Sequence, residues 1–258
     1  MSRQIQETTW ASLQMILSGV ENPRNTIEQW QTNGFLKHFL PEVDILFGVP
    51  QPPEHHPEID TGLHTMLVME QAWLLSNRDP DVVFAALLHD LGKGLTQQDR
   101  WPKHAGHEKE GLASVASVCQ RLEVPEKTAR LAMLVCEFHL HSHRAFDMRP
   151  GTVIQWLDTT GMLFDDALRQ KFLCACEADA RGRTGLEQRE YLTPFYIDHV
   201  AKLTQVQWAI QVAERRLQSS VHAVNVHYAP MSDKDHMRDI IRKEHGLQSD
   251  SAMSHGIC

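Results

Sequence analysis

The sequence predicts an all-α protein. Almost every long segment repeats its apolar residues at intervals of three and four, which is the period of an amphipathic helix. No strand-like alternation of apolar and polar residues extends beyond a few positions. The chain has 258 residues, 42% of them hydrophobic and 22% charged, so it is long enough to bury a sizeable core. We therefore expect a helical bundle.

The first part of the chain predicts short helices followed by a connector. Trp10, Leu13, Ile16 and Leu17 form an apolar stripe, and Gly19 is a plausible stop. Several prolines then predict extended backbone. The expected helices span residues 8–18, 23–31 and 34–39, and the connector spans 41–57.

Longer helices are expected after the connector. Asp60 or Thr61 is the cap candidate for the first of them, and Asp79 with Pro80 opens the second. Gly92 is expected to help end that second helix. We expect the last dozen residues to be disordered. The expected helices are 60–76, 79–90, 104–122, 125–140, 150–157, 165–180, 195–217 and 233–244.

Composition narrows the range of functions. The net charge of -8 argues against broad attraction to nucleic acid, although a local basic groove would still be compatible with it. No apolar run is long enough for a transmembrane helix, and the N-terminus lacks a signal-peptide core. The five cysteines are odd in number and form no Cys-x-x-Cys pair. Reduced thiols in a cytoplasmic protein are therefore expected.

His89 and Asp90, at the end of the apolar run 82–88, are the most informative residues. An imidazole beside a carboxylate suits divalent cations from Mn to Zn. Asp179 follows an apolar turn, where an unpaired carboxylate would be costly to bury unless it bound a cation. His64 lies near an apolar face of the preceding helix. A single histidine in such a place is more often a satisfied core residue, so the prediction depends on the set.

The order His64, His89-Asp90, Asp179 resembles the HD superfamily of metal-dependent phosphohydrolases. Several segments resemble, more narrowly, the C-terminal HD domain of the bacterial multifunctional CCA-adding enzyme (tRNA nucleotidyltransferase) family. The segments are 58–65 (EIDTGLHT), 85–96 (AALLHDLGKGLT), 101–108 (WPKHAGHE) and 177–183 (EADARGR). Upstream, residues 40–44 and 48–51 resemble the helical neck that precedes that domain.

The resemblance covers roughly residues 20–192 and implies a domain organisation. We expect a neck-like N-terminal helical segment over 1–50, an HD domain over 51–192 and a C-terminal helical extension over 193–258. The family's N-terminal head carries a Gly-rich loop and an Asp-x-Asp pair, and neither occurs in this sequence. Nucleotide addition to tRNA is therefore not expected. The implied activities are those of a phosphatase and a 2′,3′-cyclic phosphodiesterase, the former associated with nickel.

The resemblance also assigns candidate ligands. His64, His89, Asp90 and Asp179 would hold a divalent cation, with Ni, Mn, Mg, Co and Fe as candidates. Asp90 has two oxygens and could bridge to a second ion. His107 and His139 are candidates for that second ion or for direct contact with phosphate. One ion is favoured slightly over two. His107 is preferred to His104 because Gly106 and Glu108 beside it match the family segment.

Each basic residue near these ligands has two candidate roles, one in binding phosphate and one in stabilising the fold. Lys93 could reach a substrate phosphate, or act as a helix C-terminal cation. Arg181 and Arg183 could bind phosphate, or pair with Glu177 and Glu187. The remaining clustered histidines receive no role: His141 and His143 are expected to point elsewhere, and His55 and His56 to be exposed.

The leading hypothesis is a metal-dependent phosphohydrolase that uses metal-activated water on a nucleotide or RNA-end phosphate ester. His89, Asp90 and Lys93 are the candidate catalytic residues. The expected partners are a small phosphate-ester or nucleotide substrate, with tRNA or RNA ends as candidates, and no membrane. One alternative is a tRNA- or nucleotide-binding module with a structural metal site. The other is a regulatory hydrolase of alarmones or dNTPs. The sequence leaves the oligomeric state open.

Overall fold

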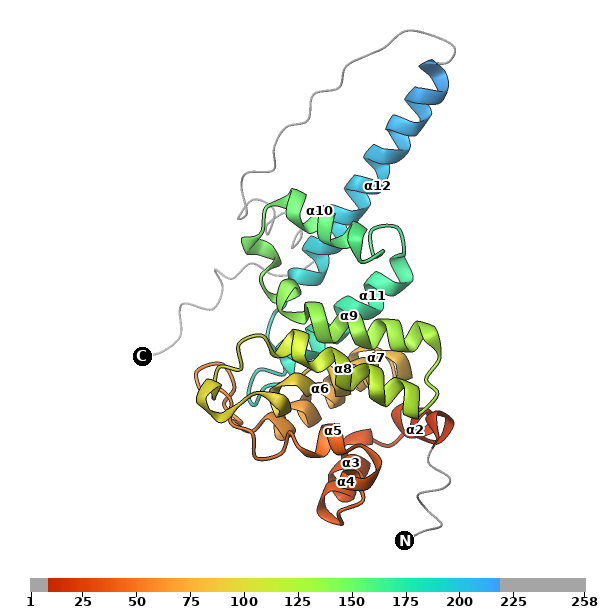
Figure 1. Cartoon of the computed structure of the whole chain (residues 1–258). Coiled ribbons are helices and arrows are strands. Elements are labelled where there is room, and N and C mark those ends of the chain that lie inside the picture. The colour runs from red at the N-terminus through yellow and green to blue at the C-terminus, as the bar shows by residue number, and fades with distance from the viewer. Residues whose placement is uncertain (1–8, 219–258) are drawn as a thin grey trace, which may run out of the picture. The chain divides into compact units, whose positions relative to one another are not determined.

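The computed structural model describes residues 9–218, and the elements in this range are helical (Figure 1). Within the described residues the only β-type pairing is an isolated antiparallel bridge between Pro50 and Asp60. The all-α prediction is therefore confirmed. The predicted helix 233–244 and the C-terminal end lie outside the described residues. The α-helices are α2 (Trp10–Leu17), α3 (Pro23–Thr32), α4 (Leu36–Phe39), α5 (Pro41–Asp44), α6 (Thr61–Leu75), α7 (Pro80–Leu88), α8 (His107–Arg121), α9 (Glu126–His143), α10 (Pro150–Thr159), α11 (Asp166–Arg181) and α12 (Thr193–Gln218).

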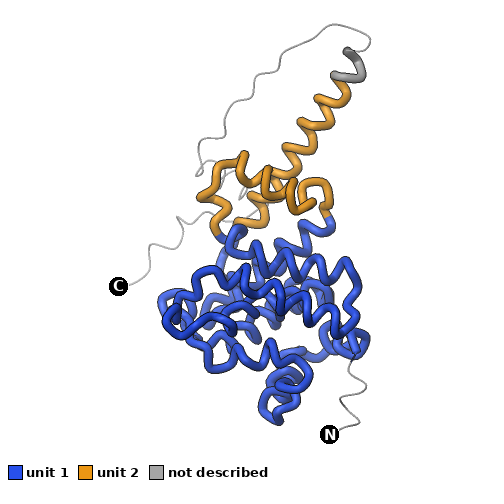
Figure 2. The backbone as a smooth tube through the Cα atoms, viewed as in Figure 1, with its two compact units in different colours: residues 1–143, 167–191 blue, residues 144–166, 192–258 orange. Residues whose placement is uncertain are grey.

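The chain divides into two compact units, shown in Figure 2. The first contains residues 1–143 and 167–191, and the second contains 144–166 and 192–258. These boundaries differ from the segments expected from the sequence. The described helices before residue 50 share the first unit with α6 to α9, and residues 144–166 belong to the unit that contains α12.

α7 is the central helix of the first unit. Its residues from Val82 to Leu88 are all buried, and it packs against α6 and α9. A helix that is apolar on every side is stable only when neighbours surround it. Burying each Val, Leu or Phe side chain contributes about 1.5–3 kcal/mol. This packing carries the residues that follow Leu88 into the interior of the unit.

The helix starts agree with the sequence signals. The Asp60 carboxylate accepts a hydrogen bond of 2.9 Å from Leu63 N and caps α6. Asp79 accepts one of 2.9 Å from Asp81 N and caps α7, with Pro80 in the first turn. Both residues satisfy amide groups that have no partner inside the helix.

Several predicted boundaries were wrong. The expected connector begins with the short helix α5, and the chain after α7 continues as a 3₁₀ turn, η1 (Leu91–Leu95). Helix α8 begins at His107 because His104 and Gly106 have φ of 50° and 84°, which an α-helix does not allow. Helix α9 extends to His143, because no glycine or proline interrupts the residues after Leu140.

Gly92 allows η1 to lie directly against α8. A Cβ atom at this position would lie 1.9 Å from His107 O and 2.7 Å from Gly111 N. Any side chain at this position would therefore clash with the backbone of α8. This contact brings the residues of η1 and the start of α8 to the same place in the first unit.

The second unit has its own small core. Phe146 and Tyr196 stack with ring centroids 4.6 Å apart. The Gln205 amide on α12 donates a hydrogen bond of 2.6 Å to Leu163 O. Among the described helices, α12 included, none is both long and apolar enough to cross a bilayer.

Candidate metal centre

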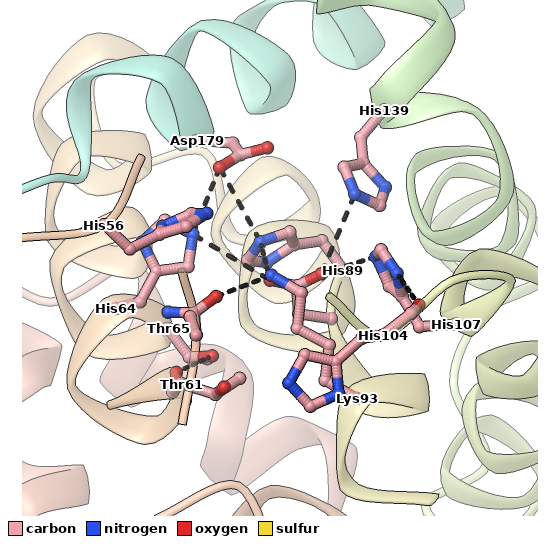
Figure 3. Close-up of polar contacts among 12 residues, drawn as sticks. His56, Thr61, His64, Thr65, His89, Lys93, His104, His107, His139 and Asp179 are labelled. Atoms are coloured by element: carbon pink, nitrogen blue, oxygen red, sulfur yellow. Dashed lines mark hydrogen bonds and ion pairs between the residues drawn. The ribbon is translucent and has the colours of Figure 1, made fainter. Parts of the chain in front are cut away.

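The predicted ligands converge in the interior of the first unit (Figure 3). Asp90 lies at the junction of α7 and η1, next to His89. The others come from helices that are far apart in the sequence. All are buried: His64 on α6, His89 and Asp90 after α7, His107 at the start of α8, His139 on α9 and Asp179 in the last turn of α11.

One group of ligands faces Oδ2 of Asp90. His89 Nε2 lies 3.0 Å from this oxygen and His64 Nε2 lies 3.8 Å from it. Asp179 Oδ1 lies 3.1 Å from His64 Nε2 and 3.9 Å from His89 Nε2. We term His64, His89 and Asp179 the His64 side of the centre.

A second group faces Oδ1 of the same carboxylate. His107 Nε2 lies 3.0 Å from Asp90 Oδ1, and His139 Nε2 lies 3.7 Å from it. We term His107 and His139 the His139 side. Figure 3 shows His64 and Asp179 to the left of His107 and His139. Asp90 is therefore shared by two sets of possible ligands.

The ligand histidines share one hydrogen-bond pattern. In each ring, Nδ1 lies within hydrogen-bond distance of a backbone carbonyl oxygen. Because a carbonyl oxygen has no hydrogen, Nδ1 carries the ring hydrogen and Nε2 keeps its lone pair. Such outer contacts orient metal-ligating histidines. The acceptors for His64, His89, His107 and His139 are Gly182 O at 3.0 Å, Ala86 O at 2.8 Å, His104 O at 2.9 Å and Val135 O at 3.1 Å.

The centre fits a cation because its buried atoms are acceptors. Within the part of the chain that the structure describes, His89 Nε2, His107 Nε2 and Asp90 Oδ1 are buried without a hydrogen-bond partner. Lone pairs of nitrogen and oxygen face one another at about 3 Å, which is unfavourable unless a cation or a proton lies between them. Imidazole and carboxylate together suit divalent transition metals. The residues present therefore fit such an ion.

Without an ion, neighbouring cations and protons balance the buried carboxylates. Burial opposes ionisation of Asp90, but His89 and Lys93 hold its pKa well below the usual range. Burial also disfavours the charged form of His89, yet Asp90 raises the pKa of that ring, so a proton competes with a cation for its Nε2. Burial likewise opposes ionisation of Asp179, and His143 holds the pKa of Asp179 well below its usual range. Burial lowers the pKa of His139 to about 3, so this ring is neutral, which is the form that binds metals. The two carboxylates supply the anionic oxygens that a divalent cation binds.

Lys93 lies against the centre. Its Nζ is 2.6 Å from Asp90 Oδ2 and donates a hydrogen bond of 2.6 Å to Gln51 Oε1. The 3₁₀ turn brings Lys93 back over Asp90, three residues earlier in the chain. Gln51, in the predicted connector, was not identified from the sequence. The contact of Lys93 with a phosphate stays a prediction.

The two arginines after Asp179 differ. Arg181 Nη2 pairs with Glu177 Oε1 at 2.5 Å. This ion pair is the alternative to phosphate binding that the sequence offered for Arg181. Arg183 Nη2 lies 3.7 Å from Asp179 Oδ1, and its Nη1 donates to His55 O at 3.4 Å. Arg183 is thus next to the centre. Glu187, the other pairing partner considered for the arginines, accepts a hydrogen bond of 3.0 Å from Gly185 N.

The prediction that His56 is exposed was wrong, whereas His55 is exposed as expected. The bridge between Pro50 and Asp60 folds the connector back, and this buries His56. Its Nδ1 lies 3.2 Å from Glu58 Oε1. Burial lowers the pKa of His56 to about 4. The same Glu58 oxygen lies 3.0 Å from His64 Nδ1, so this glutamate supports a predicted ligand.

The prediction that His143 points away from the site was also wrong. Its Nε2 lies 2.6 Å from Asp179 Oδ2. Because α9 extends to His143, this residue is on the same face as His139, one turn earlier. The spacing of four residues was the available signal, and it was lost when the helix was ended at Leu140. His141, the histidine between them, receives no role here either.

His104 has a structural place. Its Nδ1 is 2.6 Å from Thr96 Oγ1, and its Nε2 donates to Pro50 O at 2.7 Å. Both ring nitrogens are therefore occupied by polar contacts away from Asp90. The structure brings His107, and not His104, to the carboxylate of Asp90.

Comparison with known families identifies the class. Residues 61–181 match the HD domain family. This range begins at the start of α6 and ends with α11, and it includes all of the ligands named above. Residues 61–181 of the chain therefore form an HD domain.

The relatives narrow this class. The chain is 40% identical over 211 residues to the multifunctional CCA protein of Teredinibacter turnerae, covering 81% of this chain and 51% of the relative. It is 46% identical over 187 residues to that of Nitrosococcus oceani, and this similarity covers 72% of this chain and 46% of the relative. It is 52% identical over 160 residues to the multifunctional CCA protein of Methylococcus capsulatus, and this similarity covers 61% of this chain and 37% of the relative. The chain thus spans about half the length, or less, of these curated relatives.

Proposed function

We propose that the HD domain of this chain is a metal-dependent phosphohydrolase of the phosphatase or 2′,3′-cyclic phosphodiesterase type. One observation carries the proposal: imidazole nitrogens and carboxylate oxygens converge around Asp90 with lone pairs facing one another in a buried space. The HD domain over residues 61–181 supports it. The proposed substrates are nucleotides or RNA-end phosphate esters.

In this proposal His64, His89, Asp90 and Asp179 hold one divalent ion, and His107 and His139 offer ligands for a second ion through Asp90. When bound, the ion would act as a Lewis acid that lowers the pKa of water and neutralises phosphate charge. The imidazole-rich ligand set favours Ni, Mn, Co or Fe over Mg.

The protein's own residues would orient and balance the reaction. The Nδ1 hydrogen bonds fix the histidine rings before any ligand arrives. Lys93 and Arg183 place positive charge beside the two carboxylates, where a phosphate group would approach. Arg181 contributes less in this proposal, because Glu177 neutralises it.

The substrate class follows from charge and similarity. A net charge of -8 disfavours extensive contact with a long nucleic acid. A small phosphate ester, or the end of an RNA, needs only local positive charge. Similarity to multifunctional CCA proteins favours a nucleotide or RNA-end phosphate within this class.

The test removes bound metal with a chelator and restores Ni²⁺, Mn²⁺, Co²⁺ or Mg²⁺ separately. Turnover is measured on p-nitrophenyl phosphate, 2′,3′-cyclic AMP and a panel of nucleoside triphosphates and alarmones. We expect metal-dependent hydrolysis of a monoester or the cyclic diester, lost in His89→Ala and retained in His38→Ala, a substitution of an exposed histidine. No metal-dependent turnover on the panel would contradict the proposal.

A tRNA gel shift across a salt series separates the alternative of a binding module. A protein that binds the phosphate backbone loses affinity steeply as salt rises. Tight, salt-sensitive tRNA binding together with no hydrolysis would favour a binding module with a structural metal. Turnover restricted to alarmones or dNTPs would favour a regulatory nucleotide hydrolase.

A further inference from the structure

One polar contact of the centre is not explained by the ligand set. Asp179 has two carboxylate oxygens, and only Oδ1 faces His64 and His89. The other, Oδ2, lies 2.6 Å from His143 Nε2. On the far side of that ring, His143 Nδ1 lies 2.8 Å from the Tyr191 hydroxyl. The Ser142 hydroxyl also lies 3.2 Å from Tyr191 Oη.

The protonation pattern of His143 is opposite to that of the ligand histidines. An ionised Asp179 carboxylate can only accept, so His143 Nε2 carries the hydrogen and donates it. In the neutral ring, Nδ1 then accepts a hydrogen bond from the Tyr191 hydroxyl. The ligand histidines instead donate from Nδ1 and keep a lone pair on Nε2. His143 is therefore built as a hydrogen-bond donor to a ligand.

The hydrogen bond from His143 restricts how the Asp179 carboxylate can coordinate a metal ion. A carboxylate is free to offer one oxygen or both to a metal, and rotation about its C–C bond exchanges them. The charge-assisted hydrogen bond to Oδ2 opposes both changes. The His143 side chain is 17% exposed and Asp179 only 5%, so the donor lies on the outer edge of the centre.

We propose that His143, oriented by Tyr191, is a positioning residue that fixes Asp179 as a one-oxygen ligand and keeps a coordination position open for water or substrate. This inference rests on the proposed metal-dependent function. His143 acts through Asp179 and does not contact the reacting atoms. It also explains why α9 supplies two histidines one turn apart, since His139 faces Asp90 and His143 faces Asp179.

The test compares His143→Ala, His143→Gln and Tyr191→Phe with wild type. Co²⁺ is the probe, because calorimetry gives its affinity and its visible absorption reports coordination number. We expect His143→Ala to lower Co²⁺ affinity about ten- to a hundredfold and to weaken the absorption as Asp179 adds its second oxygen. The Gln amide can donate to Asp179, so His143→Gln should recover most of the affinity. Tyr191→Phe should lose a few-fold, and His38→Ala nothing.

Each outcome has a defined meaning. Co²⁺ affinity and absorption in His143→Ala equal to wild type would overturn the positioning role, and so would a Gln variant no better than the Ala variant. Circular dichroism of the chelated proteins checks folding. If His143→Ala does not fold, Tyr191→Phe decides the question, and wild-type behaviour of that variant overturns the role. A wild-type protein that binds no Co²⁺ would overturn the proposed function itself.

Discussion

The two sides of the centre share Asp90 but are held in different ways. On the His139 side, His139 donates to Val135 O, four residues earlier, and His107 donates to His104 O, three residues earlier. On the His64 side, His64 donates to Gly182 O, 118 residues away, and Asp179 accepts from His143. The His139 side is oriented by local backbone alone. The His64 side has one local contact, from His89 to Ala86 O, and is otherwise oriented by residues that only the tertiary structure brings together.

This difference has a physical consequence. The acceptor for His139 exists whenever α9 is formed, and the acceptor for His107 exists whenever the turn that leads into α8 is formed, so the His139 side is oriented by residues nearby in the sequence. The His64 side needs α6, α9 and α11 to be assembled around it. Second-sphere side chains such as Glu58 can therefore tune the His64 side, whereas the His139 side offers mainly its ligands to substitution.

The largest effect is expected from Asp90→Ala, because Asp90 belongs to both sides. Loss of the ion removes several kcal/mol of charge stabilisation, so hydrolysis should fall by about a thousandfold, equivalent to about 4 kcal/mol. Elemental analysis should find no bound metal. His139→Ala should lose at most the ion on its own side. Equal metal content in the two variants would show that the two sides do not bind separately.

Metal removal comes next. An ion present at about a hundred times its Kd stabilises the folded state by about 2.7 kcal/mol. Chelation should lower the free energy of unfolding by about this amount in a denaturant titration. Hydrogen exchange locates the effect: loss of protection confined to α6 and the end of α11 indicates an ion on the His64 side alone. Loss in α9 as well would indicate ions on both sides.

Gly92→Ala should disturb the His139 side specifically. The new Cβ would lie 1.9 Å from His107 O, so η1 and α8 must separate, which lowers the free energy of unfolding by about 2 kcal/mol. Gly151→Ala is the matched control, because no atom lies within 4 Å of its added Cβ and alanine favours the helix. Equal denaturation midpoints for the two variants would contradict the close contact.

The smallest effect is expected from Glu58→Gln. The amide keeps the size of the side chain but removes the charge 3.0 Å from His64 Nδ1. Such second-sphere changes lower metal affinity, here by about tenfold. Calorimetry with Co²⁺ measures it, and Glu54→Gln, at an exposed glutamate in the same connector, is the control. Unchanged affinity in Glu58→Gln would show that Gly182 O alone orients His64.

The same contrast explains what the sequence could predict. Helix periods and the caps Asp60 and Asp79 are local signals, and they located α6 and α7 closely. The set of His64, His89-Asp90 and Asp179 was found because it matches a family pattern, and the HD domain match includes all of these positions. The structure brings them together, although their role as ligands stays a prediction.

Two of the missed contacts join residues that are far apart in the sequence: Gln51 contacts Lys93, 42 residues away, and Tyr191 contacts His143, 48 residues away. Glu58 is closer to its partner His64, but the two lie on either side of the start of α6, so no helix period relates them. His143 alone had a local signal, in its four-residue spacing from His139. That signal depended on the end of α9, and helix ends are the least certain part of a sequence-based prediction.

The carbonyl of Gly182 sets a practical limit on how short a working fragment can be. Both α11 and the family match end at residue 181, so that position is the natural place to truncate. A fragment ending there would lose the acceptor that orients His64. Residue 182 must also stay a glycine, because a Cβ would lie 2.6 Å from the backbone of Val68. The shortest piece that keeps every contact of the centre must extend at least to Tyr191.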